Sequence, residues 1–494
     1  MPGIRDDDRK LGRGTAWVGI ASGLSGILDL ITTVACLRLW LSTEDLGTAT
    51  LAGALLPVIE RLAGAGMPAA LVRRADGDRR ALSTLLWVCV ASSCAVLVAL
   101  IGVGPWIGRA YGKPIIGSLL IGYGVKLVLQ SAHVVPEALL RRELGFDRLT
   151  RVRIAASTGD ALAKLIAAYL GAHGYPELRI WCFAIGPLTN GVVTSIGIQL
   201  CRPWWPALAF DRAVAAGALR YGAQVAGGEL LYFVYTSADY LVIGAAWGEA
   251  AVGAYRLAYE LVLDVVRLIS LVTAEVAFPA FARPGDDARA GALLIRFTRQ
   301  NAIALAPVIA FLAVEAGDLL AVLYPPLGPA ATTAARILCV VGGLRVLSFV
   351  LPAMLAGLGH AGDALLYHVL ACVLLPAAFA LAAWQWPGAG YVAVAWAWAA
   401  AYPVAFGVLL QRALVRGRVR LASYLRSVAG VVACGAGAAG GAIAVHAVLP
   451  GPPLGRLVAV AAVIVAIYTG LIAWIERITP RSILRMVRGM TEGT

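Results

Sequence analysis

The stretch GAYRLAYELVLDVVRL, residues 253–268, combines an apolar helical pattern with four charged side chains. The charges are Arg256, Glu260, Asp264 and Arg267, and their spacings of 4, 4 and 3 place them on one face of a helix. A charge at the centre of a bilayer costs roughly 2.5–3.5 kcal/mol on insertion scales, so such a face avoids lipid. The stretch therefore predicts either self-neutralising pairs or a helix that lines a water-filled cavity.

The composition of the whole chain is that of a membrane protein. Its 494 residues are 60% hydrophobic and 14% charged, with a mean hydropathy of +0.81, whereas a soluble domain has about 25% charged residues. We identify about 14 apolar segments of about 20 residues or more, each long enough to cross a bilayer as a helix. Their approximate ranges are 15–40, 47–71, 81–104, 115–140, 153–171, 179–201, 219–244, 250–276, 298–319, 331–357, 364–385, 389–411, 427–449 and 454–476. An all-α polytopic membrane protein is therefore expected.

Basic residues orient these segments. With the N-terminus in the cytoplasm, most of the 41 Lys and Arg residues fall in inner loops and tails, with clusters at 73–80, 141–153 and 412–426. The outer loops hold Arg38, Arg109, Lys113, Arg179, Arg336 and Arg456. By the positive-inside rule both termini should be cytoplasmic, and the net charge of +13 then calls for no nucleic-acid partner.

A second stretch resembles the opening one at an offset of 206 residues. In GTATLAGALLPVIERL (47–62), Gly47 aligns with Gly253 and Arg61 with Arg267, and both stretches follow an acidic turn and run on to a proline and a basic end. Six segments separate the copies, so both cross the membrane in the same direction. The duplication predicts two six-helix lobes related by a pseudo-twofold axis along the membrane normal, with a substrate site between them.

The predicted organisation has two lobes and an apolar helix pair. The ranges are 1–14 for a cytoplasmic tail, 15–201 for the N-lobe, 202–218 for a cytoplasmic linker, 219–411 for the C-lobe, 412–426 for a basic cytoplasmic loop, 427–476 for the accessory pair and 477–494 for a basic cytoplasmic tail. The accessory pair carries little charge, and the spacing of Gly437 and Gly441 permits close helix packing.

Polar stripes recur on other predicted helices. They comprise Ser22, Ser25, Asp29, Thr32 and Cys36 in the first segment, Lys126, Gln130, His133 and Glu137 in the fourth, and Arg153, Ser157, Asp160 and Lys164 in the fifth. Two interpretations stay open. Neighbours of opposite charge, such as Asp160 and Lys164, either only lock helices together or belong to a water-filled cavity.

Four passages resemble the polysaccharide-transporter branch of the multidrug/oligosaccharidyl-lipid/polysaccharide (MOP) exporter superfamily, the O-antigen-type flippases. STEDLGTATLAGALLPVIERLAGAGMPAALVRR (42–74) resembles the second-helix signature, and LRRELGFDRLTRVRI (140–154) the loop after the fourth helix. ADYLVIGAAWGEAAVGAYRLAYEL (238–261) with AFPAFAR (277–283) resembles the region of helices 7 and 8, and residues 323–362 that of helices 9 and 10. The last two segments resemble the added helix pair of a related lipid II flippase.

The resemblance implies a flippase that carries an undecaprenyl-diphosphate-linked oligosaccharide across the inner membrane for O-antigen, exopolysaccharide or capsule assembly. In this family two six-helix lobes alternate between inward-open and outward-open states, and cavity cations are thought to hold the diphosphate. The residues suited to that role are Arg61, Lys126, Lys164, Arg256, Arg267 and Arg345. Asp29, Glu229 and Asp239 are candidates for coupling to a proton or Na⁺ gradient, with the membrane potential as a further energy source.

This interpretation predicts no catalytic residue, no cofactor and no metal site, because moving a lipid needs no covalent step. The eight cysteines form no C-x-x-C motif. Membrane lipids, a polymerase and glycosyltransferases of the same pathway are the expected partners. A drug/cation antiporter of the same fold, a lipid II flippase and a membrane glycosyltransferase or polymerase are the alternatives. An antiporter cavity should be net acidic, whereas these cations are about balanced by Glu60, Glu137, Asp160, Glu229, Asp239, Glu260 and Asp264.

Overall fold

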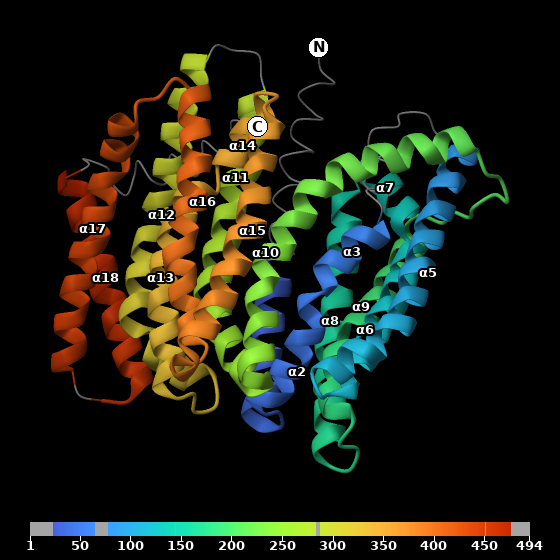
Figure 1. Ribbon diagram of the computed structural model, residues 1–494, viewed down its shortest axis with the longest axis horizontal. Helices are drawn as coiled ribbons and strands as arrows, with labels where there is room; N and C mark the ends of the chain where they lie inside the picture. Colours follow the sequence, from blue (N-terminus) through green and yellow to red (C-terminus); the bar gives the residue numbers. More distant parts are fainter. Residues whose placement is uncertain (1–22, 65–77, 144, 283–286, 450, 476–494) are drawn as a thin grey trace. The chain divides into compact units, whose positions relative to one another are not determined.

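The computed structural model describes residues 23–64, 78–143, 145–282, 287–449 and 451–475, which are helical and contain no strand (Figure 1). They form two compact units, one up to Gly253 and one from Ala254. The all-α fold is thereby confirmed. The predicted tails lie outside the described residues, and the lobe boundaries inferred from the sequence stay a prediction.

Each unit is a series of helices. The first unit contains a helix over residues 23–39, then α2 (Thr43–Ala54), α3 (Leu56–Gly64), α5 (Arg79–Ala110), α6 (Pro114–Ser131), α7 (Val134–Arg142), α8 (Phe146–Ala172), α9 (Leu178–Cys201) and most of α10 (Arg212–Tyr259). The second unit continues with the π-helical turn η1 (Glu260–Asp264), α11 (Val265–Ala282), α12 (Asp287–Leu323), α13 (Pro329–Ser348), α14 (Leu351–Gly357), α15 (Ala361–Gln385), the 3₁₀ turn η2 (Pro387–Ala389), α16 (Val392–Arg416), α17 (Leu421–Val448) and α18 (Pro453–Ile475).

Eleven of the described helices are long and apolar enough to cross a membrane. Three predicted segments are outside that set, namely 15–40, 153–171 and 250–276. The first is described only from residue 23, and the other two carry the charged stripes that lower their mean hydropathy. The protein is therefore a multi-pass membrane protein, and the expected number of about 14 spans stays a prediction.

The helix α10 starts earlier than the sequence suggested. Residues from Arg212 on were predicted to belong to a linker, but Asp211 accepts hydrogen bonds from the backbone N–H groups of Ala213 (2.8 Å) and Val214 (3.2 Å) and thereby caps the helix. The predicted interruption before residue 250 is confined to Gly248, whose φ of 79° favours glycine.

Prolines break three of the predicted segments. The breaks lie between α2 and α3 just before Pro57, between α6 and α7 just before Pro136, and between α13 and α14 just before Pro352. A proline lacks the N–H that a helix needs, and its ring clashes with the carbonyl group four residues earlier. The helix of each of these segments is therefore interrupted partway along its length.

The duplicated stretches match in structure at two positions. The offset of 206 residues carries the break at Leu55 onto the π-helical turn η1, so both copies depart from α-helical geometry at the same place. The aligned glycines also pack against each other. A Cβ atom on Gly47 would overlap the carbonyl group of Glu249, lying 2.6 Å from its carbon, and one on Gly253 would lie 2.9 Å from the carbonyl carbon of Thr43. Close backbone contact is therefore the reason for glycine at both positions.

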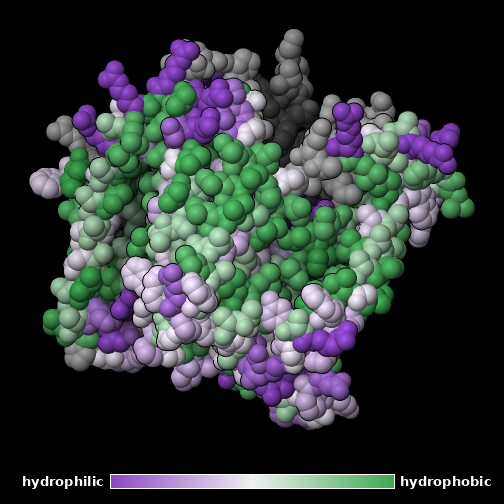
Figure 2. Space-filling view, viewed as in Figure 1, coloured by the Kyte–Doolittle hydropathy of each residue, from purple (hydrophilic) through white to green (hydrophobic). Residues whose placement is uncertain are grey.

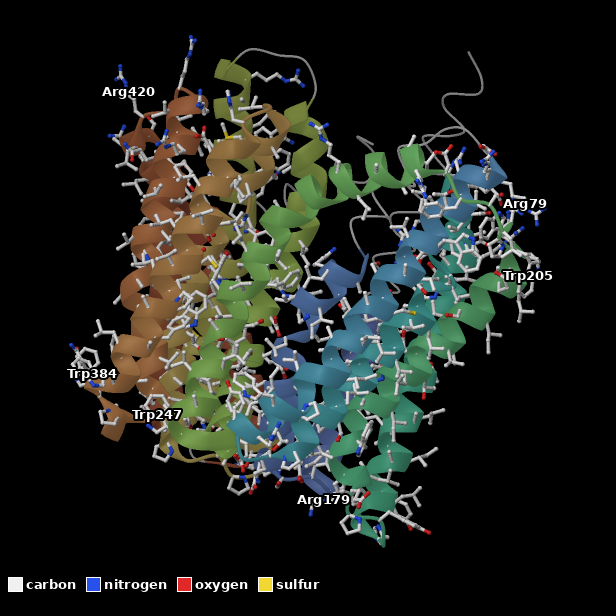
Figure 3. All side chains as sticks on the ribbon, turned by 45° about the vertical axis from the view of Figure 1, so that its right-hand side comes forward. Arg79, Arg179, Trp205, Trp247, Trp384 and Arg420 are labelled. Carbon is white, nitrogen blue, oxygen red and sulfur yellow. The ribbon has the colours of Figure 1, made fainter. Side chains whose placement is uncertain are left out.

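Polar residues gather at the ends of the helices. Apolar side chains cover the middle of each unit on the face shown in Figure 2, and hydrophilic ones lie towards the ends. In the first unit, Arg79 and Trp205 lie at one end and Trp247 at the other; in the second, Arg420 and Trp384 mark opposite ends (Figure 3). Arg and Trp at helix ends are typical of the interface between membrane and water.

The accessory pair, α17 and α18, packs along α12. Its apolar contact is made by Cys434, Ala438, Ala442, Val460, Ile464 and Tyr468 together with Val314 of α12. A Cβ atom on Gly437 would lie 2.9 Å from Cδ1 of Leu471, and Gly441 faces Ile467, so the glycine pair lies in the close α17–α18 contact that its spacing predicted.

Candidate functional site

Two of the candidate cations in the first unit form ion pairs between helices. Nζ of Lys126 on α6 donates a hydrogen bond to Oε1 of Glu60 on α3 at 2.9 Å. Nζ of Lys164 on α8 donates to Oδ1 of Asp29 at 2.5 Å, joining α8 to the helix over residues 23–39. Lys164 thus forms its short ion pair with a carboxylate on a neighbouring helix, and Asp160, the partner considered from the sequence, interacts with it electrostatically.

A third cation of this unit, Arg61, lies in the last described turn of α3. Its side chain is exposed, and its guanidinium carbon lies 5.4 Å from the ring centroid of Phe233 on α10. The polar stripe of the first segment also meets α8, since Oγ of Ser157 donates a hydrogen bond to Oγ of Ser25 at 2.7 Å. Polar side chains on four elements of the first unit thus form contacts between helices, α3 with α6 and α8 with the helix over residues 23–39.

The opening stretch of the sequence forms both of its predicted pairs. Nε of Arg256 donates to Oε1 of Glu260 at 2.5 Å, and Nε of Arg267 donates to Oδ1 of Asp264 at 3.1 Å. The second pair is the more open, with side chains 45% and 41% exposed. The π-helical turn η1 holds both carboxylates, one at each of its ends.

Arg345 on α13 is buried within aromatic rings. Its guanidinium carbon lies 4.7 Å from the ring centroid of Trp398, 5.7 Å from that of Tyr402 and 5.8 Å from that of Tyr259. Nη1 also donates a hydrogen bond to the hydroxyl oxygen of Tyr259 at 3.2 Å. The cage was not predicted from the sequence, because its rings come from α10 and α16, far from Arg345 along the chain.

The three candidates for ion coupling differ in their surroundings. Asp29 is 66% exposed beside Lys164, whereas Asp239 on α10 is fully buried and accepts a hydrogen bond from the backbone N–H of Tyr240 at 2.9 Å. Glu229 lies on α10 as well, but its side chain is outside the described residues. Of the two candidates whose side chains are described, Asp29 is therefore the solvent-exposed one.

Several of these charges stay exposed within predicted membrane segments. Asp29 is 66% exposed, Glu60 is 38% exposed and Asp264 is 41% exposed. Contact between a charged side chain and hydrocarbon is costly, so such groups face water rather than lipid. Because a carboxylate neutralises each of Lys126, Lys164, Arg256 and Arg267, a bound anion has to compete with these carboxylates.

A different acidic group joins the accessory pair to α12. Glu315, Asp318 and His446 offer ligand atoms within 4.8 Å of one another, as a metal site would. However, Arg456 on α18 donates hydrogen bonds to both carboxylate oxygens of Asp318, and Glu315 lies 2.7 Å from Nδ1 of His446. Both carboxylate oxygens of Asp318, Oε1 of Glu315 and Nδ1 of His446 are thus engaged within the protein, whereas Oε2 of Glu315 is buried with no hydrogen-bond partner among the described residues. The arrangement is therefore that of a polar latch between helices, and the sequence did not single it out.

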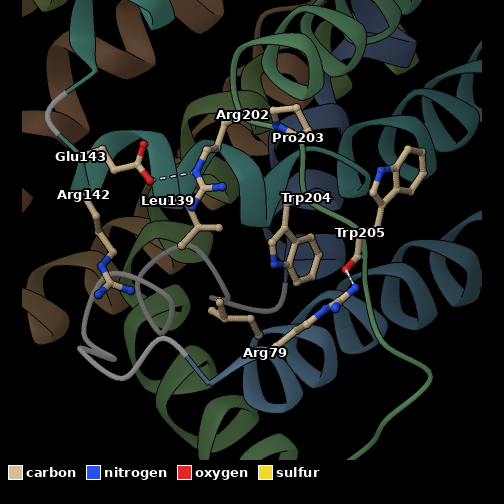
Figure 4. A pocket seen from close by; sticks show the side chains of 9 residues that line it. Arg79, Leu139, Arg142, Glu143, Arg202, Pro203, Trp204 and Trp205 are labelled. Carbon is tan, nitrogen blue, oxygen red and sulfur yellow. Dashed lines mark hydrogen bonds and ion pairs between the residues drawn. The ribbon is translucent and has the colours of Figure 1, made fainter.

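A basic cavity lies at one end of the first unit. It has a volume of about 660 Å³ and is lined by Arg79, Leu82, Leu139, Arg142, Glu143, Arg202, Pro203, Trp204 and Trp205 (Figure 4). The paired tryptophans in the basic stretch after α9 were the signal in the sequence that could have revealed it.

Comparison with known proteins identifies the family and the fold. A family model described as "Polysaccharide biosynthesis protein" matches residues 37–325. The lipopolysaccharide biosynthesis protein WzxC of Escherichia coli K12 is 24% identical over 276 residues, which cover 56% of this chain and 55% of WzxC. The amylovoran biosynthesis protein AmsL of Erwinia amylovora is 26% identical over 331 residues, covering 66% of this chain and 84% of AmsL. The match thus spans about half the length of WzxC and most of AmsL.

A solved structure has a similar arrangement of helices. The lipid II flippase MurJ, in an inward closed conformation, aligns with a TM-score of 0.72 at 12% sequence identity, covering 93% of this chain and 98% of MurJ. This likeness confirms the MOP flippase fold that the sequence resemblance predicted. Together with the match over residues 37–325, it shows that this multi-pass membrane protein belongs to the polysaccharide biosynthesis protein family.

Proposed function

We propose that the protein is a flippase that moves an undecaprenyl-diphosphate-linked oligosaccharide across the inner membrane by alternating access, for assembly of a surface polysaccharide. The family and the names of WzxC and AmsL support a role in polysaccharide biosynthesis. We further propose that both termini are cytoplasmic, that the lobes span 15–201 and 219–411, and that a polymerase and glycosyltransferases act in the same pathway.

The observation that carries the proposal is the set of paired but solvent-exposed charges inside membrane segments. A sugar–diphosphate head must cross about 30 Å of hydrocarbon, and it needs a hydrated path to do so. Glu60 beside Lys126 and Asp264 beside Arg267 supply polar surface at that depth. The isoprenoid tail can meanwhile stay in lipid.

The ion pairs suggest how the proposed substrate path binds the diphosphate of the substrate. In the empty protein each carboxylate neutralises its cation, so the lining carries little net charge. A diphosphate offers more acceptor oxygens than a carboxylate, and the planar guanidinium group of arginine can bind two of them at once. The incoming diphosphate therefore replaces the carboxylate of Asp264 at Arg267 and that of Glu60 at Lys126. We assign the same role to Lys164 and Arg256. We also assign phosphate binding to Arg61 and Arg345, which lie against aromatic rings.

A double substitution separates ligands from structural pairs. Lys126→Ala leaves Glu60 without this ion pair. Transport should be lost whether Lys126 binds the diphosphate or only stabilises the contact between α3 and α6. Combining Lys126→Ala with Glu60→Ala removes the unbalanced charge. We expect transport to stay lost in the double variant, in vesicles that report inward-to-outward movement of the labelled lipid-linked glycan, while Lys126→Arg retains part of it. Recovery of transport in the double variant would remove Lys126 from the substrate path.

Energy coupling is tested with the same vesicles. We propose that Asp29 and Asp239, together with Glu229, bind a proton or Na⁺ during transport. Asp29→Asn should remove the acceleration that an imposed gradient causes while leaving slow, gradient-independent transport. Rates that do not respond to a proton gradient, a Na⁺ gradient or a membrane potential in the unsubstituted protein would exclude these carboxylates from coupling.

The substrate alternatives differ in the head group. A lipid II flippase would move a peptidoglycan precursor, and a drug/cation antiporter would move an organic cation against a gradient. Offering each substrate to the same vesicles distinguishes the three. We expect transport of the lipid-linked glycan, with no exchange of an organic cation for protons or Na⁺. The described acidic partners Glu60, Asp29, Glu260 and Asp264 do not outnumber the six candidate cations, so the site is not net acidic.

A further inference from the structure

The basic cavity of the first unit combines three features of a site for a lipid phosphate. Arg79, Arg142 and Arg202 line it with one carboxylate, Glu143, so its lining is net positive. Nε of Arg202 donates a hydrogen bond to Oε1 of Glu143 at 2.8 Å (Figure 4). Leu82 and Leu139 give it an apolar wall, and two tryptophans close one side.

The segment that closes the cavity is fixed to α5. Nε1 of Trp87 donates a hydrogen bond to the carbonyl oxygen of Ala207 at 3.0 Å, and the N–H of Ala207 donates to Oγ of Ser83 at 2.8 Å. Nη2 of Arg79 donates to the carbonyl oxygen of Trp205 at 3.2 Å. The backbone of the irregular stretch between α9 and α10 is therefore held by hydrogen bonds to side chains on one face of α5, those of Arg79, Ser83 and Trp87.

The same segment presents apolar side chains to its surroundings. Trp205 is 70% exposed, Leu208 is 96% exposed and Phe210 is 52% exposed. Large exposed apolar groups beside basic residues are typical of surfaces that lie in a membrane interface, where tryptophan is enriched. The hydrogen bonds to α5 hold the backbone of this segment while its apolar side chains stay exposed, so the segment can contact lipid.

The length of α5 puts the cavity at the depth of the lipid head groups. Its 32 residues extend about 48 Å, whereas the hydrocarbon core is about 30 Å thick. The first turns of α5, which begin with Arg79 and contain Leu82, therefore project into the head-group region. The apolar residues of α5 that follow, such as Leu85 and Leu86, are buried in the core, so the apolar surface open to acyl chains is that of Trp205, Leu208 and Phe210.

We propose that this cavity is a binding site for an anionic phospholipid of the adjoining leaflet, with the phosphate held by Arg79 and Arg202 and the acyl chains along Trp205 and the apolar wall. The charge of the lining fits a phosphate diester, and the exposed apolar segment fits acyl chains rather than a free ion. The site goes beyond the proposed transport and does not depend on which substrate the protein carries.

The test measures lipid preference in nanodiscs that contain the full-length protein. Tryptophan fluorescence is quenched with phosphatidylglycerol or phosphatidylcholine brominated on the acyl chains. We expect stronger quenching by the anionic lipid, and Trp205→Phe should remove that excess. Arg79→Gln should lower the preference for phosphatidylglycerol about fivefold, since one basic residue near an anionic surface contributes roughly 1 kcal/mol. Equal quenching by the two lipids in the unsubstituted protein would overturn the proposal.

Two further variants guard against misfolding and general charge effects. Glu143→Gln should strengthen the preference, because it removes the carboxylate that shares Arg202, and a merely misfolded cavity would not gain affinity. Arg109→Gln, at the opposite end of α5, changes the same charge and should leave the preference unchanged. A loss with Arg109→Gln equal to that with Arg79→Gln, or displacement of the lipid by millimolar inorganic phosphate, would refute a site for phospholipid.

Discussion

Replacing Gly47 with alanine should destabilise the protein because two backbones meet at this position. The new Cβ atom would overlap the carbonyl group of Glu249 and lie 2.9 Å from the backbone nitrogen of Gly253. Both neighbours are backbone atoms of α10, so no side chain can move aside, and the helices must separate. Forcing an added group into a packed contact costs about 1–3 kcal/mol, while alanine gains roughly 0.5–1 kcal/mol over glycine within a helix. We expect a net loss of about 1–2 kcal/mol.

Gly53 provides the matched control, because it lies on the same helix and a Cβ atom there would have no neighbour within 4 Å. Gly53→Ala should keep or slightly raise stability. The measurement is the temperature at which half of the detergent-purified protein is lost from the monodisperse peak in size-exclusion chromatography after heating. Gly253→Ala should resemble Gly47→Ala. If Gly47→Ala is as stable as Gly53→Ala, the close contact of the duplicated stretches is not what requires glycine.

Three further outcomes follow from side-chain contacts. Arg456→Ala leaves Asp318 without its cation in the polar latch and should lower heat stability, because one partner of the pair is then unneutralised. Adding Asp318→Asn should restore stability in the same heating assay. The hydrogen bond from Lys113 holds the pKa of Glu249 below its ordinary value of 4.5. A lowered pKa means that the ionised carboxylate stabilises the fold at pH values above 4.5, and this stabilisation disappears as the pH falls through the lowered pKa. The unsubstituted protein should therefore be more heat-stable than Lys113→Gln at pH 7. The difference should shrink below pH 4.5 and in high salt. Arg345→Lys should lower heat stability by about 1 kcal/mol because an ammonium group cannot stack flat on the rings around it; unchanged stability would mean that the cage does not depend on a planar group.

Sequence reasoning succeeded where the interaction is local. Arg256 and Glu260 are four residues apart on one helix, and that spacing alone brings their side chains together. Lys164 also has a carboxylate four residues away, Asp160, yet it pairs with Asp29, 135 residues distant. A pair between helices depends on which faces pack together, and a single sequence does not contain that information. The aromatic cage of Arg345 escaped notice for the same reason.

Eleven of the predicted spans overlap helices that are long and apolar enough to cross a membrane, but the breaks within some of them were not predicted. Pro57, Pro136 and Pro352 break their helices, but α9 continues through Pro187 and α16 through Pro403. The ring clash is the same at every proline, so the outcome depends on whether neighbouring helices can satisfy the freed carbonyl groups. The repeat was more informative, because the aligned glycines marked a contact that two copies of one motif make with each other.

The ion pairs of the path also determine how the membrane potential acts on the proposed cycle. A carrier has to return empty after each delivery, and moving one elementary charge through 100 mV changes the free energy by about 2.3 kcal/mol. In the proposed cycle Lys126 with Glu60 and Arg267 with Asp264 are neutral pairs, so these four residues add almost no net charge to the movement of the empty protein. The loaded protein carries the negative phosphates of its substrate. The membrane potential therefore changes the free energy of the translocation step but has little effect on the return of the empty protein.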